Sequence, residues 1–138
     1  YAYVTGDWCE RGTGGGTPHY GIDVAGAMGS DVYAPVSGTA VVHYSSSFGR
    51  TLGILNGNYL IFFAHLGRIA YSSGEYIEQG SVIGTIGMTG RTSGPHAHIG
   101  YGVRSLSRSG TRLGKHRYRL TDPKLFFYRE IFLGGVGS

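Results

Sequence analysis

Short apolar runs, separated by glycine, proline, serine and asparagine, make up most of this chain. The runs are rich in Val, Ile, Tyr and Phe, and they cover residues 31–34, 38–43, 51–55, 59–64, 82–88 and 96–103. Runs of this length and composition predict β-strands, and the short breaks between them are typical of antiparallel hairpins. We therefore predict an all-β fold of antiparallel sheets, with long loops that form a groove.

The two ends of the chain follow other patterns. Residues 1–17 are expected to be loop-like, because three successive glycines at 14–16 are costly to order in a helix. Near the C-terminus, residues 122–131 predict one short helix, in which Asp122 is the cap and Pro123 takes the first helical position.

Length and composition indicate a single domain over residues 1–138, since 138 residues with 41% hydrophobic content suffice for one core. Nowhere does the chain approach the roughly 18 consecutive apolar residues of a membrane-spanning helix. Its start, at Tyr1, lacks the pattern of an export signal, and we expect a fragment or processed form. The lone Cys9 excludes an internal disulfide, and we assign it no chemistry.

The charge of the chain is concentrated in one segment. Lys and Arg number 12 against 8 Asp and Glu, which gives a net charge of +4 and favours anionic surroundings. Six of those 12 basic side chains lie in residues 104–119, which have little apolar periodicity. We interpret this segment as a solvated basic loop insertion that is able to contact an anionic polymer.

Histidine and aspartate recur at spacings that suit a metal site. His19 and Asp23 are four residues apart, and His96 and His98 are two apart, so each pair shares one face of a strand. His65 ends an apolar run, where an unpartnered ring is costly to bury. Two neutral imidazoles and one carboxylate form a catalytic zinc set with an open fourth position. Each signal is weak alone, and their occurrence together in one small domain favours a functional site over isolated strand histidines.

These motifs make the chain resemble the lysostaphin-type family of zinc peptidoglycan endopeptidases. The resemblance rests on HYGID, FFAHL and PHAHIGY, and it extends to VYAPVSGTAVVHY, to the approach YIEQGSVIGTIGMTG and to Asp122–Pro123. It implies that His19, Asp23 and His98 bind one Zn²⁺ per chain, and that His65 and His96 are catalytic. One of the catalytic pair would move protons and the other would stabilise the oxyanion. His43 and His116 match no functional position.

The same resemblance implies a function and a location. The chain is expected to hydrolyse peptide bonds in the stem or cross-bridge of bacterial peptidoglycan through a metal-activated water. Its expected location is extracellular, periplasmic or cell-wall associated, and this includes a phage virion or lysis protein. The sequence leaves open whether the bond lies in a glycine-rich bridge or between D-alanine and a diamino acid. It also assigns neither the substrate-binding residues nor the oligomeric state.

Three other functions fit parts of the sequence. A catalytically inactive wall-binding or hydrolase-activating domain is the main alternative, although all five functional positions are occupied. A lipoyl or biotinyl carrier domain would need an exposed lysine in its hairpin turn, and the sequence has none there. A nucleic-acid binder is suggested only by the pI of about 9.3 and the basic segment, without a binding motif, so no nucleic-acid partner is expected.

Overall fold

The computed structural model describes residues 3–6, 22–90, 92 and 94–122. Within these ranges it contains no helix, and every regular element is a β-strand. The strands are β1 (Tyr3–Gly6), β2 (Ile22–Ala25), β3 (Asp31–Tyr33), β4 (Gly38–Ser45), β5 (Gly49–Asn56), β6 (Tyr59–Ile69), β7 (Tyr76–Ile77), β8 (Val82–Ile86), β9 (His96–Ser105), β10 (Thr111–Leu113) and β11 (His116–Thr121). The predicted all-β class is confirmed.

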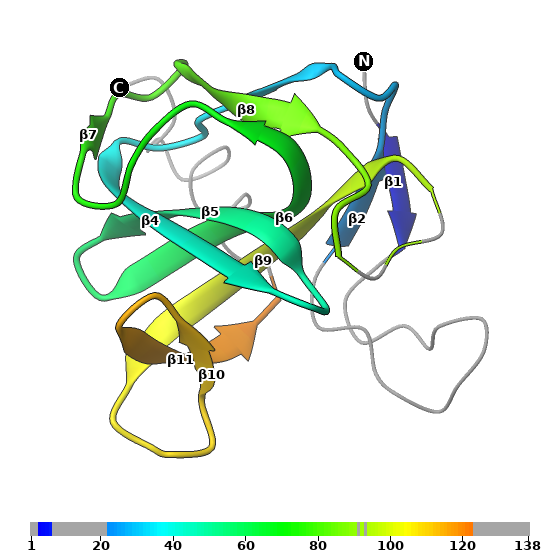
Figure 1. The fold of residues 1–138 in the computed structure, drawn as a ribbon. Coiled ribbons are helices and arrows are strands. Elements are labelled where there is room, and N and C mark those ends of the chain that lie inside the picture. The colour runs from blue at the N-terminus through cyan, green and yellow to red at the C-terminus, as the bar shows by residue number, and fades with distance from the viewer. Residues whose placement is uncertain (1–2, 7–21, 91, 93, 123–138) are drawn as a thin grey trace.

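The strands form one curled antiparallel sheet (Figure 1). Its main path runs β1-β2-β9-β6-β5-β4-β7, and two branches leave this path. β8 pairs with β3 and with the C-terminal part of β6, while β11 pairs with β10 and with the C-terminal part of β9. β9 therefore pairs with β2 near its start and with β11 toward its end, so it spans the molecule from one end to the other.

The central strand β6 is buried on both faces. Every residue from Leu60 to Leu66 is buried, and successive side chains point to opposite faces of the sheet. One face packs Leu60 and Phe62 against the β10–β11 hairpin, and the other packs Ile61 and Phe63 into the main core. This two-sided burial explains why residues 59–64 read as a continuous apolar run rather than as an alternating one.

Six predicted runs correspond to β3, β4, β5, β6, β8 and β9, with ends that differ by a few residues. The expectation of a loop over residues 1–17 is wrong at Tyr3–Gly6, because these residues form β1 and pair with β2. The predicted helix over 122–131 lies, beyond Asp122, outside the described residues.

The prediction for the basic segment 104–119 is wrong. The segment was expected to be a solvated loop, but it holds the end of β9, all of β10 and most of β11. Gly114 and Lys115 form the turn between β10 and β11, with Gly114 at φ 66°. Buried Leu113 and Tyr118 alternate with exposed arginines, and the charge of those arginines concealed a strand pattern from hydropathy alone.

Candidate metal and catalytic site

The pairing of β2 with β9 sets Asp23 directly opposite His98. Residues that are directly opposite in an antiparallel pair point to the same face, so the carboxylate and the imidazole converge. His98 Nδ1 lies 3.0 Å from Asp23 Oδ1. The ring of His98 stacks on Phe48 at 5.7 Å between centroids and also contacts Phe62 at 6.2 Å. Aromatic packing thus fixes the orientation of this histidine.

His96 reaches the same carboxylate from two residues earlier on β9. Its Nε2 lies 3.4 Å from Asp23 Oδ1, and its Nδ1 lies 2.9 Å from the carbonyl oxygen of Gly94. Hydrogen bonding to Asp23 raises the pKa of His96 above its ordinary value, although burial opposes this effect. His96 is therefore held in a setting that favours a proton on the ring.

His65 lies at a bulge in β6. The pairing of β5 with β6 shifts between Arg50 and Leu52, and β6 leaves β9 after Ala64 to join β8 from Leu66. His65 has φ 61°, which is uncommon for a residue other than glycine, and its N–H donates to the Phe48 carbonyl at 2.7 Å. A bulge of this kind redirects a side chain, and here it turns the His65 ring toward His96, 5.0 Å away between centroids.

The protonation of the His65 ring follows from one contact. Its Nδ1 lies 2.8 Å from the carbonyl oxygen of Thr89, which only accepts hydrogen bonds. Nδ1 must therefore carry the hydrogen in the neutral ring, and Nε2 keeps its lone pair. Burial lowers the pKa of His65, and the bond to Thr89 counters only part of this effect. A buried neutral imidazole with a free lone pair at Nε2 can accept a proton.

Thr89 is tied to the strand ends around His65. Its hydroxyl donates to the Leu66 carbonyl at 2.7 Å and accepts from the Arg50 N–H at 3.0 Å. Two glycines make this packing possible, because a Cβ at Gly49 would lie 2.3 Å from the Thr89 carbonyl carbon. A Cβ at Gly90 would likewise lie 2.3 Å from the backbone nitrogen of Gly49. Thr89 was not among the predicted site residues, since a group that acts through its backbone carbonyl leaves no motif.

The predicted residues can now be placed. Asp23, His65, His96 and His98 lie together, whereas His19 is outside the described residues. His43 lies elsewhere, and its Nδ1 accepts the Gly114 N–H at 3.1 Å. His116 lies in β11, paired with Leu113 of the basic hairpin. Both histidines thus lie outside this cluster.

The donor set at Asp23 and His98 fits zinc. Carboxylate oxygen and imidazole nitrogen are ordinary zinc ligands, and two ligand atoms of one tetrahedral ion lie about 3.4 Å apart. The 3.0 Å between Asp23 Oδ1 and His98 Nδ1 is close to that separation. Across the described ranges, no group of three or more His, Cys, Asp or Glu side chains is arranged to hold a metal ion. Asp23 and His98 would therefore be two of the three ligands, and the predicted third, His19, falls outside those ranges.

Comparisons with known proteins identify a peptidase family. Residues 17–109 match the model of peptidase family M23. The chain is 36% identical over 89 residues to the peptidoglycan DD-endopeptidase ShyA of Vibrio cholerae, which covers 63% of this chain and 21% of ShyA. It is 33% identical over 98 residues to lysostaphin of Staphylococcus simulans, covering 68% of this chain and 20% of that protein. The chain thus spans about a fifth of the length of these curated relatives.

Solved structures show the same likeness. The catalytic domain of lysostaphin from Staphylococcus simulans superposes with a TM-score of 0.77 at 28% identity, covering 91% of each chain. A zinc-containing peptidase from Vibrio cholerae superposes with a TM-score of 0.67 at 27% identity, over 86% of this chain and 36% of that one.

Proposed function

The chain belongs to peptidase family M23, and from this we propose that it is a zinc-dependent endopeptidase that hydrolyses a peptide bond of bacterial peptidoglycan. The observation that carries the proposal is the register of β2 and β9. It places Asp23 opposite His98, beside the two further histidines that metal-assisted peptide hydrolysis would use. The relative ShyA is a peptidoglycan DD-endopeptidase, and this relationship together with the structural likeness to the catalytic domain of lysostaphin supports a peptidoglycan substrate.

We assign His19, Asp23 and His98 as the zinc ligands. Zinc in such a site supplies a Lewis acid that polarises a carbonyl group and lowers the pKa of water. The two histidines bind the metal as neutral rings and Asp23 binds it as a carboxylate, so the affinity for zinc should weaken at acidic pH. Contacts of the His98 ring with Phe48 and Phe62 help to keep Nδ1 directed toward Asp23.

The two remaining histidines divide the proton chemistry. His65 presents an unprotonated Nε2 because the Thr89 carbonyl holds its Nδ1 hydrogen, so we assign it as the general base. His96 retains a proton more readily than an ordinary histidine, so we assign it as the donor that stabilises the developing oxyanion. Each group of this kind contributes roughly 10²- to 10⁴-fold to the rate.

This function places the protein outside the cytoplasm, in an extracellular, periplasmic or wall-associated setting. The part of the chain that the structure describes has no helix that is long and apolar enough to cross a membrane. The cleaved bond lies either in a glycine-rich bridge or between D-alanine and a diamino acid, and the two produce different products. Mass spectrometry of defined muropeptides after incubation with the protein identifies that bond directly.

The ligand assignment is tested by metal content. His19→Ala, Asp23→Ala and His98→Ala should each lose zinc, because each removes one of three protein ligands. His65→Ala and His96→Ala should keep about one zinc per chain, while turnover falls by at least about 10²-fold. His43→Ala, which alters a histidine outside the site, should keep both zinc and turnover.

Two results would contradict the proposal. Full zinc occupancy in all three ligand variants would refute the assigned metal site. A zinc-loaded wild-type protein that leaves every muropeptide intact would instead support the inactive wall-binding alternative.

A further inference from the structure

The β10–β11 hairpin carries arginines on one face. Arg112 of β10 lies directly opposite Arg117 of β11, and Arg119 follows two residues later on the same face. All three side chains are exposed, while Leu113 and Tyr118 on the other face pack into the core. The hairpin therefore has an apolar inner face and a cationic outer face.

The arginines of this face lie close enough to repel one another. Like charges directly opposite on a sheet are destabilising, and among the described residues no carboxylate forms an ion pair with Arg112, Arg117 or Arg119. The guanidinium groups of Arg112 and Arg117 are nevertheless held in place. Arg112 Nε donates to the Gly114 carbonyl at 3.2 Å, and Arg117 Nη1 donates to the Gly110 carbonyl at 2.8 Å. Each arginine keeps further N–H groups for an anion.

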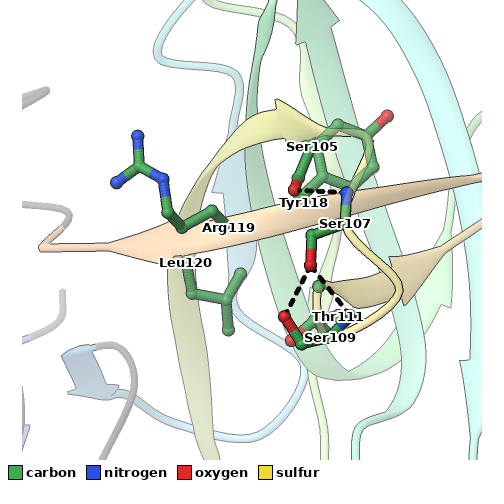
Figure 2. Close-up of a pocket in the computed structure, with 8 residues that line it drawn as sticks. Ser105, Ser107, Ser109, Thr111, Tyr118, Arg119 and Leu120 are labelled. Atoms are coloured by element: carbon green, nitrogen blue, oxygen red, sulfur yellow. Dashed lines mark hydrogen bonds between the residues drawn. The ribbon is translucent and has the colours of Figure 1, made fainter.

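A hollow of about 510 Å³ is lined in part by Arg119, which Figure 2 shows with the neighbouring serines. Arg117 adjoins it, because its Nη1 donates to the carbonyl of Gly110, which also lines the hollow. Its lining includes Ser105 at the end of β9, Ser107 and Ser109 of the loop between β9 and β10, and Thr111, Tyr118 and Arg119 of the hairpin. That loop is ordered by its own hydrogen bonds, since the Ser107 N–H donates to Ser105 Oγ at 3.1 Å and the Ser109 N–H donates to Ser107 Oγ at 3.2 Å. Ordered serine hydroxyls and the side chain of Arg119 thus line the same hollow.

We propose that this surface, formed by Arg112, Arg117, Arg119 and the serine-lined hollow, binds a phosphodiester-linked polyol chain of the bacterial cell surface. Guanidinium groups bind phosphate through paired, charge-assisted hydrogen bonds. The serine hydroxyls suit the hydroxyl groups of the polyol units. The choice of a cell-surface polymer rests on the proposed function, which places the protein at the wall.

The chemistry of the surface favours this polymer over single-stranded nucleic acid. Proteins that bind single strands combine positive charge with aromatic side chains on which the bases stack. The tyrosine of the hairpin, Tyr118, lines the hollow but is 1% exposed and packs in the core. No tyrosine, phenylalanine or tryptophan ring of the hairpin is therefore exposed for a base to stack on.

The surface is separate from the histidines. β9 carries His96 and His98 at its start and Ser105 at its end, where it pairs with Arg117. Arg119 lies opposite Val103 and Arg117 opposite Ser105, so at roughly 3.4 Å per residue these arginines are about 17–24 Å from His98 along β9. Polymer binding therefore leaves the peptidase site open, and the two activities can be measured independently.

The test uses the full chain and a fluorescent oligomer of glycerol phosphate, with binding followed by anisotropy. Wild-type protein should bind, and its affinity should fall as salt rises. Arg112→Gln and Arg117→Gln should each weaken binding about fivefold, because an exposed ionic contact changes affinity by a few fold. Each should also reduce the dependence of log Kd on log salt by about one. Arg117→Lys keeps the charge but loses the paired hydrogen bonds, and should bind less well than wild type.

Arg68→Gln is the matched control, because it removes the same charge from an exposed position at the far end of β6. It should bind like wild type. Equal losses in Arg68→Gln and Arg117→Gln would overturn the proposal, since net charge alone would then explain binding. Tighter binding of a single-stranded DNA oligomer of equal charge would overturn the choice of polymer.

Cleavage of a short soluble muropeptide is measured on the same preparations, and it should be unchanged in all of these arginine variants. Wild-type protein that cleaves the muropeptide but does not bind the oligomer would overturn this inference and leave the proposed function intact. Oligomer binding without any cleavage would instead refute the proposed function.

Discussion

At the scale of single residues, the most informative position is His65. Its left-handed backbone conformation is one that L-residues adopt at a cost of roughly 1–2 kcal/mol. The surroundings impose this conformation, because the backbone N–H of His65 is bonded to Phe48 and its ring to Thr89. The strain directs the imidazole toward His96.

This strain predicts an unusual order of stabilities. His65→Gly should be more stable than His65→Ala by about 0.5–1 kcal/mol, because glycine accepts a positive φ without penalty. Denaturant unfolding of the two variants measures the difference. The neighbouring Ala64→Gly is the control, and it should destabilise the fold by more than about 0.5 kcal/mol, as glycine does within an ordinary strand. Equal stability of the two His65 variants would contradict an imposed strain.

The sequence indicates which of these side chains lie together but not how they are arranged. Spacings of four and two residues place Asp23, His96 and His98 on shared faces of strands, and the structure brings these three together with His65. His19 stays a prediction. No periodicity could reveal the positive φ of His65 or the role of the Thr89 carbonyl, because both depend on how distant strand ends pack.

At the scale of elements, the bulge in β6 depends on Thr89. The Thr89 hydroxyl bridges the strands β5 and β6, while its carbonyl orients His65. Thr89→Val keeps the shape of the side chain but removes the hydroxyl, so the carbonyl should lose its fixed position. We expect turnover of a muropeptide to fall by about tenfold, the lower end seen when a supporting hydrogen bond is lost at a metal site.

Thr89→Ser separates this effect from a general loss of stability. Serine restores the hydroxyl and both of its hydrogen bonds, so it should recover most of the turnover. Zinc content should stay constant in both variants, since neither touches Asp23 or His98. Comparable turnover in Thr89→Val and wild type would show that the hydroxyl is dispensable for positioning His65.

Strands were predicted correctly where both faces are buried and the sequence is apolar. They were missed where one face of the strand carries charged residues. The runs that became β5 and β6 are apolar because the sheet buries them. β10 and β11 alternate arginine with Leu113 and Tyr118, so only one face of the hairpin contributes to hydropathy. The alternation of apolar and charged residues, considered apart from the mean hydropathy, indicates these strands.

At the scale of the whole molecule, His43 links the main sheet to the β10–β11 hairpin. Its Nδ1 accepts the N–H of Gly114, so this nitrogen must be unprotonated. Burial lowers the pKa of His43, and the nearby Arg112 lowers it further. The ordinary value of a free histidine is about 6.5. Protonation therefore costs more in the folded protein than in the unfolded chain.

The resulting pH dependence has a definite sign. The contribution of His43 to stability is complete above about pH 6.5 and is lost as the pH falls through the lower pKa of the folded state. His43→Asn keeps an acceptor near the position of Nδ1 but does not titrate in this range. Between about pH 7.5 and about pH 5, the Tm of wild type should fall further than that of His43→Asn. Parallel decreases in the two proteins would exclude His43 as the titrating link.

The length of β9 has a consequence for where the protein acts. A polymer held at the hairpin would bring stem peptides into a zone about 20 Å away along β9, at an effective concentration set by that separation rather than by diffusion from bulk solution. Peptides attached nearer to or farther from the anchoring point would fall outside this zone. Cuts made by one bound molecule should therefore cluster in a narrow band of wall, at a distance that β9 fixes.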